Sequence, residues 1–221
     1  MIPGPTYVFQ CPQCHNLLTR ESLVSGNTFH STGYSDGKLI APMLPDFPNL
    51  TKCKKCNHLF WLSKLEEIGT FNYGEKDKLE WQNADEAEFL SIDDYFRALD
   101  SGFIIGKGEE GFVRQQIWWA FNDRTRAEGI IFTDNNDESL YIHNCLDFIE
   151  LLDPENENEK MLIAEVYRNM GNFGRCLELI EDIRDDELSG IVVNLRSECG
   201  KKNRWVIPLE KVVQPTYDGD D

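Results

Sequence analysis

Two short stretches, CPQCH at residues 11–15 and CKKCNH at residues 53–58, each hold two cysteines separated by two residues. Two such pairs supply four thiolates, the number that a tetrahedral structural Zn²⁺ site needs. An aromatic, apolar strand candidate precedes the first pair (TYVFQ, 6–10) and another follows the second (HLFWL, 58–62). The pattern predicts a zinc ribbon, in which two hairpin knuckles clamp one ion. The expected metal ligands are Cys11, Cys14, Cys53 and Cys56.

Two other chemistries use a CxxCH run. Haem attachment would use Cys11, Cys14 and His15, but it leaves the second cysteine pair without a role. A redox dithiol would place its first cysteine at a helix N-terminus, whereas a strand is expected before Cys11. His15 or His58 could also replace one cysteine as a ligand. Four protein ligands still close the coordination sphere in that case, so no open position for a catalytic water is expected.

The knuckle pattern predicts the backbone conformation after each second cysteine and raises the question of loop length between the pairs. The residue after the second cysteine of a knuckle often needs a left-handed backbone, which Asn57 suits and His15 tolerates. Thirty-eight residues lie between Cys14 and Cys53, whereas zinc ribbons commonly have about 15–20. Doubling a loop costs only about 0.6 kcal/mol, against roughly 10 kcal/mol or more from structural zinc. Within this long loop, SDGK (35–38) predicts a hairpin turn, and three prolines interrupt residues 39–50.

Composition favours a cytoplasmic protein. The N-terminal sequence MIPGPTYVFQ lacks the basic and apolar regions of a signal peptide, and no apolar run approaches the roughly 18 residues that span a bilayer. An odd number of cysteines, seven, fits poorly with a complete disulfide framework. We therefore expect reduced cysteines and no membrane association.

Charge is unevenly distributed. Residues 1–65 hold six Lys and Arg against three Asp and Glu, which gives +3; because the whole chain carries −17, the remainder carries −20. A field of that sign repels phosphate backbones, so nucleic acid is unlikely to bind the larger part of the chain. Weak binding through the first 65 residues stays open.

From residue 85 onward the apolar period becomes helical. The expected fold class is α+β: a small β-rich zinc ribbon (1–65), a connector (66–84), an all-α helical domain (85–205) and a tail (206–221). Ser91 is expected to cap the first helix, and Gly102 to follow its end. The expected helices lie within residues 91–102, 109–129, 137–154, 158–171, 172–183 and 184–200.

One helical pair, AEVYRNMGNFGRCLELI (164–180), resembles a tetratricopeptide repeat. Small residues allow close helix approach and a glycine makes the tight turn, as in such repeats. The matching positions are Ala164, Tyr167, Gly171, Phe173, Cys176 and Ile180. The resemblance covers about 34 residues and implies stacked helix pairs. An unrelated helical bundle is the alternative.

Several other features have a structural interpretation beside a functional one. The run GKGEEGFV (106–113) matches glycine-rich nucleotide loops, but no βαβ unit follows, and its glutamates suit a helix N-terminus better than a phosphate site. Of the adjacent Trp118 and Trp119, one is expected in the core. Asn122 and Arg124 could hold a peptide carboxylate or form ordinary salt bridges. The three remaining cysteines are expected to be buried structural thiols: Cys145, Cys176 and Cys199.

The layout of the whole chain resembles that of uncharacterised bacterial cytosolic proteins that join an N-terminal four-cysteine ribbon to a tetratricopeptide-like region. The resemblance implies a non-enzymatic module that binds a protein or peptide. One alternative is nucleic-acid binding through the ribbon, by Lys52, Lys54, Lys55 and either Phe60 or Trp61. The other is an enzyme whose site the sequence does not reveal.

Overall fold

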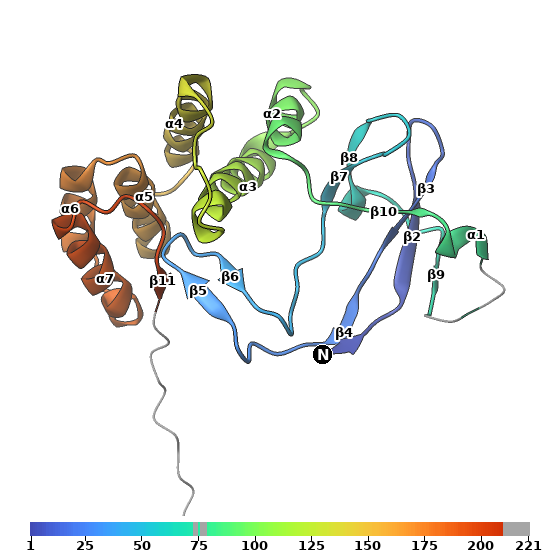
Figure 1. Ribbon diagram of the computed structural model, residues 1–221, viewed down its shortest axis with the longest axis horizontal. Coiled ribbons are helices and arrows are strands. Elements are labelled where there is room, and N and C mark those ends of the chain that lie inside the picture. Colours follow the sequence, from blue (N-terminus) through green and yellow to red (C-terminus); the bar gives the residue numbers. More distant parts are fainter. Residues whose placement is uncertain (73–74, 76–78, 210–221) are drawn as a thin grey trace, which may run out of the picture. The chain divides into compact units, whose positions relative to one another are not determined.

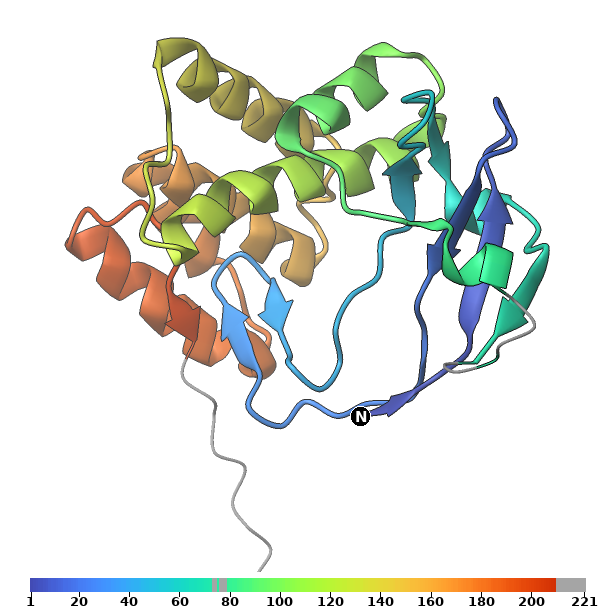
Figure 2. The ribbon, with the colours of Figure 1, turned by 45° about the vertical axis from the view of Figure 1, so that its right-hand side comes forward.

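A computed structural model describes residues 1–72, 75 and 79–209. It divides the chain into two compact units (Figures 1 and 2). The first, here called the N-terminal unit, comprises residues 1–31 and 40–98. The second, the helical unit, comprises residues 32–39 and the chain from residue 99 onward. Parts of the predicted connector (73–74 and 76–78) and most of the predicted tail (210–221) lie outside the described residues.

A four-stranded sheet forms the centre of the N-terminal unit. Its order is β10–β3–β2–β9, from β2 (Thr6–Gln10), β3 (Leu17–Arg20), β9 (Gly69–Phe71) and β10 (Asp85–Glu86). Strand β2 pairs antiparallel with β3 and β9, whereas β10 pairs parallel with β3. The first CxxC pair lies in the turn between β2 and β3.

A second hairpin carries the other cysteine pair. Strands β7 (Leu50–Lys52) and β8 (Leu59–Trp61) pair antiparallel, and a 3₁₀ turn, η1 (Leu62–Lys64), follows. A third pair joins β1 (Ile2–Pro3) to β4 (Leu23–Ser25). Two helices complete this part of the chain: α1 (Leu79–Gln82) and α2 (Ile92–Asp100). The backbone N–H of Asp94 donates to Ser91 Oγ at 3.2 Å, which confirms Ser91 as the cap of α2.

Helices α3 (Gly106–Arg126) and α4 (Asn135–Glu150) contact each other and begin the helical unit (Figure 2). Next come α5 (Glu157–Asn169), α6 (Phe173–Glu181), the 3₁₀ turn η3 (Asp186–Leu188) and α7 (Ser189–Gly200), and contacts join α5 to α6 and α6 to α7. The observed helices agree with the predicted ranges to within a few residues, except that η3 occupies the start of the last one. Side-chain oxygens of three polar residues accept backbone N–H groups at the helix starts: Asp134, Asn156 and Asn172.

The α5–α6 pair packs as its sequence pattern predicts. Ala164, Cys176 and Ile180 are buried in one apolar cluster, and the partly buried Tyr167 and Phe173 pack against it. Between the helices the backbone of Gly171 is left-handed, with φ of +83°, a conformation that glycine adopts without steric cost. The helical hairpin is therefore observed, whereas tetratricopeptide-like stacking of the whole helical region stays a prediction.

A small sheet belongs with the helices. Its order is β11–β5–β6, from β5 (Thr32–Tyr34), β6 (Leu39–Ile40) and β11 (Pro208–Leu209). Residues 35–38 turn the chain between β5 and β6, and Gly37 has φ of +77°, so the predicted SDGK turn is confirmed. Residues 32–39 nevertheless group with the helical unit, although they lie between the two cysteine pairs in sequence.

The units differ from the predicted domain boundaries at 65 and 85. Residues 69–71 and 85–86 supply β9 and β10, because the outer edges of β2 and β3 accept them as further strands. The N-terminal unit therefore continues to residue 98 and lacks residues 32–39. Within the described ranges, no helix combines the length and the apolar character needed to cross a membrane.

Candidate metal centre

Each CxxC pair forms a tight knuckle held by two backbone hydrogen bonds. The N–H of His15 donates to the Cys11 carbonyl at 2.9 Å, and the N–H of Asn57 donates to the Cys53 carbonyl at 2.8 Å. The N–H of each first cysteine donates in turn to the carbonyl five residues later, at 2.9 Å in both knuckles. The two turns therefore share one backbone geometry.

The residue after the second cysteine is left-handed in both knuckles. His15 has φ of +60° and Asn57 has φ of +58°. This conformation redirects the chain so that the second strand of each hairpin can return beside the first. Asparagine enters it more readily than most residues, and histidine also does so more often than average. The predicted left-handed positions are confirmed.

The four sulfur atoms of the knuckles meet in one group. All lie within 4.8 Å of one another, with Cys11 Sγ 3.7 Å from Cys56 Sγ and Cys14 Sγ 3.6 Å from Cys53 Sγ. A disulfide would need about 2.05 Å, so these are separate thiols. Four thiolates at about 2.3 Å from a central ion define a tetrahedron with an edge of about 3.8 Å. The observed separations are those of a site that could hold a metal ion.

Burial acts to raise the pKa values of Cys11 and Cys14, whereas backbone hydrogen bonds act to lower them. Burial raises the pKa of Cys11 to about 12. A hydrogen bond from the backbone of Asn16 lowers the pKa of Cys14 to about 7, since it stabilises the thiolate. Backbone N–H groups directed at sulfur are what a negatively charged metal–thiolate cluster requires, because they offset its charge.

An apolar cluster supports the centre from the sides of both hairpins. Cys11 and Cys53 are fully buried in it, whereas Cys56 is exposed and Cys14 half-buried. The cluster contains residues from β2, β3 and β8 and from the segments after β8 and β10: Phe9, Leu18, Phe60, Leu62 and Ala87. One side of the cysteine group is therefore held by close packing, which fixes the positions of the first cysteine of each pair.

His15 and His58 do not join the sulfurs. Among the described residues, the group of possible ligand atoms consists of the four thiols. The ring of His58 stacks on Phe60, with centroids 6.2 Å apart. Neither histidine is placed as a substitute ligand.

Four of the five residues proposed for nucleic-acid contact are paired or buried within the N-terminal unit, whereas Lys55 is exposed. Lys52 forms an ion pair with Asp94, and Lys54 pairs with Glu88 at 2.6 Å. The side chain of Phe60 is 5% exposed, and Trp61 is almost as buried at 6%. A stacking platform for bases needs accessible ring faces, which these two rings do not offer.

Comparison with protein-family models, curated proteins and solved structures gave no match for this chain. Two features of the chain's geometry stand out: the cysteine group and a buried polar network in the helical unit.

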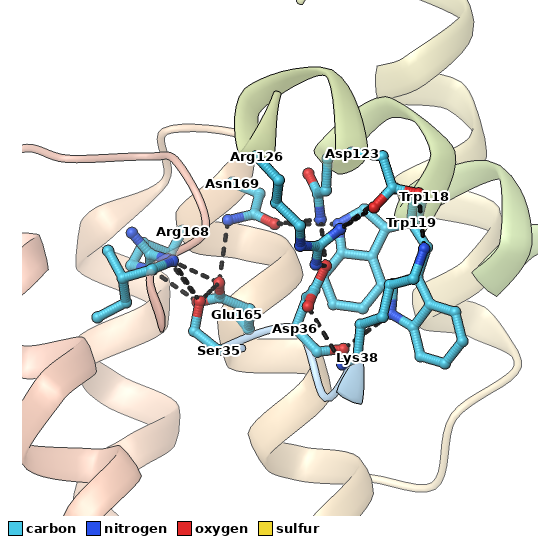
Figure 3. A network of polar contacts seen from close by, with 12 residues as sticks. Ser35, Asp36, Lys38, Trp118, Trp119, Asp123, Arg126, Glu165, Arg168 and Asn169 are labelled. Carbon is cyan, nitrogen blue, oxygen red and sulfur yellow. Dashed lines mark hydrogen bonds and ion pairs between the residues drawn. The ribbon is translucent and has the colours of Figure 1, made fainter. Parts of the chain in front are cut away.

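The polar network was not foreseen from the sequence, which indicated only a turn at its centre. Trp118 lies in the core, as predicted for one of the two tryptophans. Trp119 donates from Nε1 to the carbonyl of Asp36, at 3.0 Å (Figure 3). Asn122 donates to the Asp36 carboxylate at 2.9 Å, whereas Arg124 pairs with Asp137 at 2.5 Å. A carboxylate is indeed held beside Asn122, and it comes from the chain itself.

The glycine-rich run is a helix start. Residues from Gly106 onward form the first turns of α3, and Glu109 Oε2 accepts the backbone N–H of Ile105 at 2.9 Å. This acidic residue therefore caps the helix, as its position suggested.

The remaining histidine on α4 and the other cysteines lie in ordinary structural contacts. Nδ1 of His143 lies 2.7 Å from the carbonyl oxygen of Ser139, and Asp147 pairs with Arg114 at 2.9 Å. The predicted burial of the remaining thiols is confirmed for Cys145, Cys176 and Cys199. Burial raises the pKa of Cys145 to about 12, which is typical of a structural thiol.

Proposed function

We propose that the protein is a non-enzymatic, cytoplasmic protein–protein interaction module, in which a structural zinc ion stabilises the N-terminal unit and the helical unit binds a protein or peptide. The observation that carries the binding role is the way α3 and α5 hold residues 32–39. This segment reaches the helices from a part of the chain otherwise built into the N-terminal unit. The helical unit therefore already binds a polypeptide segment that is distant in sequence from its helices.

Zinc is supported by ligand type and by geometry. Four thiolates with separations near 3.7 Å suit a tetrahedral ion with soft ligands, the preference of Zn²⁺ in a reducing compartment. A Cys₄ site has no open coordination position, so the ion would act by holding the two knuckles together. Its binding energy would then add to the folding energy of the N-terminal unit.

Tetratricopeptide-like stacking is supported by the α5–α6 pair. Ala164 and Cys176 are buried in one apolar cluster of this pair, Tyr167 and Phe173 pack against that cluster, and α7 contacts α6. Repeat arrays of this kind offer extended helical surfaces to peptides and proteins. The large net negative charge after residue 65 favours a partner with a complementary basic surface.

The two alternatives have less support. Nucleic-acid binding is disfavoured by the ion pairs of Lys52 and Lys54 and by the burial of Phe60 and Trp61. An enzyme would need titratable groups that converge on a space for substrate. The buried charges of the helical unit, Asp36, Glu165 and Arg168, instead bind one another or neighbouring polar groups.

Affinity capture with the full chain as bait, followed by re-measurement with purified components, tests the binding role. We expect a partner whose binding is weakened by Leu146→Glu or Val193→Glu, since both residues expose apolar side chains on the helical unit. The matched control Lys54→Ala, in the N-terminal unit, should leave the affinity unchanged. Binding that survives both helical variants and is lost in the control would contradict the proposal.

Two direct measurements complete the test. Metal analysis of protein purified without chelators should find about one equivalent of zinc per chain. Fluorescence titration with single-stranded nucleic acid at low salt should show no binding; a salt-dependent complex would favour the nucleic-acid alternative.

A further inference from the structure

The turn between β5 and β6 binds helices α3 and α5 through the side chains of Ser35, Asp36 and Lys38 and through the backbone carbonyl of Asp36. The carboxylate of Asp36 is fully buried; it accepts from Asn122 Nδ2 at 2.9 Å and forms an ion pair with Arg126. Its backbone carbonyl accepts from Trp119 Nε1 at 3.0 Å. The guanidinium of Arg126 also lies over the ring of Tyr34, 4.5 Å from its centroid.

The residues on either side of Asp36 are bound as well (Figure 3). The hydroxyl of Ser35 donates to Glu165 Oε1 at 2.7 Å and accepts from Arg168 Nη2 at 3.3 Å. The ammonium of Lys38 pairs with Asp123 at 2.6 Å. A hydroxyl, a carboxylate and an amine of one turn thus each meet a complementary group on the helices.

Contacts among the helical residues also hold these groups. Glu165 and Arg168 lie three residues apart on α5 and form a bidentate pair, at 2.6 and 2.7 Å. On α3, Arg126 pairs with Asp123 at 2.6 Å, also three residues apart. Trp118 Nε1 donates to Asn169 Oδ1 at 3.0 Å and fixes that amide. Preorganised groups lose little freedom when a ligand arrives, which favours binding.

The contact between the turn and the helices consists mainly of buried ion pairs and hydrogen bonds, which are interactions that give a binding interface its specificity. Buried ion pairs add little net stability compared with apolar packing, but they demand one partner and one geometry. The contact is also imperfect: Nε of Arg126 is buried and has no hydrogen-bond partner in the part of the chain that the structure describes. A ligand that reached this donor would bind the same site more completely.

The turn is joined on both sides to segments of the N-terminal unit. It belongs to the 38 residues between Cys14 and Cys53, while both flanking segments, up to residue 31 and from residue 40, group with the N-terminal unit. Three prolines at positions 42, 45 and 48 keep the second flank from forming regular structure. A segment tethered in this way competes with free ligands at an effective concentration of about millimolar.

We infer that α3 and α5 form a recognition site for a tight turn bearing a hydroxyl, a carboxylate and an amine, and that residues 34–38 occupy this site within the chain. The partner is a protein that presents an exposed turn of the same chemistry and displaces the internal one. This inference rests on the proposed binding role of the helical unit and specifies its partner. Because a partner must displace the internal turn, the affinity of the turn for the site sets the lowest affinity at which a partner can bind.

The test uses the full chain labelled with 5-fluorotryptophan, because Trp119 touches the bound turn. Its ¹⁹F resonance is assigned by Trp119→Phe. The probe is a backbone-cyclised peptide with the sequence of residues 32–39, TGYSDGKL. In the chain carrying Asp36→Ala, we expect the Trp119 resonance to shift and the peptide to return it towards its original position. The peptide should bind this variant at least about tenfold more tightly than the wild-type chain, whose site is filled.

Matched controls separate recognition from general weakening. Asp46→Ala removes an exposed carboxylate from the same inter-knuckle segment and should leave the resonance and the weak peptide binding as in wild type. A peptide with Asn in place of the residue equivalent to Asp36 should fail to restore the resonance. If Asp36→Ala does not fold, Lys38→Ala loosens the turn through a partly exposed ion pair and serves in its place.

Three results would overturn the inference: unfolding of both variants, which would make the turn part of the core; no restoration by about 1 mM peptide; or equal binding by the wild-type chain and the loosened variant. The proposed function fails separately. A captured partner that binds the helical unit equally well with and without saturating peptide would keep the binding role and exclude this site. If the peptide restores the Trp119 resonance but no cellular partner is captured, the recognition site on α3 and α5 is supported and the proposed protein-binding role is not.

Discussion

Replacing Arg168 by methionine should destabilise the helical unit by about 3–5 kcal/mol near neutral pH. Arg168 and Glu165 are both fully buried and joined by two hydrogen bonds, so methionine fills the space but leaves a carboxylate without its cation. Ser35 and Asn169 still donate to that carboxylate and keep the loss from being larger.

The loss should depend on pH in a specific direction. Burial already raises the pKa of Glu165, against the lowering effect of Arg168. Removing the guanidinium raises this pKa further above its unfolded value, so the folded variant binds a proton that the unfolded chain releases. Because the pKa of Glu165 is raised in the wild-type fold too, both chains lose stability equally just above the unfolded pKa of about 4.3. The deficit of the variant grows, by up to about 1.4 kcal/mol per pH unit, only above the pKa of Glu165 in the folded wild type.

Urea unfolding followed by circular dichroism at 222 nm, at about pH 5.5 and about pH 8, measures the effect. Two variants serve as controls. Arg196→Met breaks an exposed pair with Glu181 at 3.8 Å and should cost less than about 1 kcal/mol. The double variant Glu165→Gln with Arg168→Met removes both charges and should lose the pH dependence. A deficit in Arg168→Met that shrinks as pH rises, or stays below about 1 kcal/mol throughout, would refute the reasoning.

Three further outcomes are expected. Cys53→Ser should lower bound zinc from about one equivalent to well below half, measured by elemental analysis, while Cys145→Ala retains it; equal zinc in both would contradict the four-cysteine site. Asn57→Ala should cost the N-terminal unit about 1–2 kcal/mol because alanine disfavours φ of +58°, whereas Asn57→Gly should not; equal unfolding midpoints would refute this. Asn172→Ala should cost about 1 kcal/mol by leaving the Arg175 N–H without its cap, and Asn172→Asp should restore it in thermal unfolding.

Local features of this protein were predictable because their causes are local. The left-handed backbone at His15 and Asn57 follows from the two-residue spacing of a knuckle, which returns the chain within one turn. The helices follow from apolar periodicity with polar caps at their starts, as at Ser91. The turn at residues 35–38 follows from a glycine in a short polar run.

The place where that turn packs was not predictable from the sequence. Asp36 and Lys38 read as solvent-exposed turn residues, and nothing in the local pattern indicates that a carboxylate will be buried against Arg126, 90 residues later. The same holds for β9 and β10, which are too short for a period and exist because free strand edges are available to them.

The sequence by itself determined the two cysteine knuckles, the helices and their caps, since each depends on residues a few positions apart. Only the tertiary structure decided that the long loop between the cysteine pairs carries a turn into the helical unit. It also decided that Trp119 and Asn122 hold this turn. Contacts between residues more than 80 positions apart leave no periodic trace in the chain, because they depend on which surfaces meet after the elements have formed.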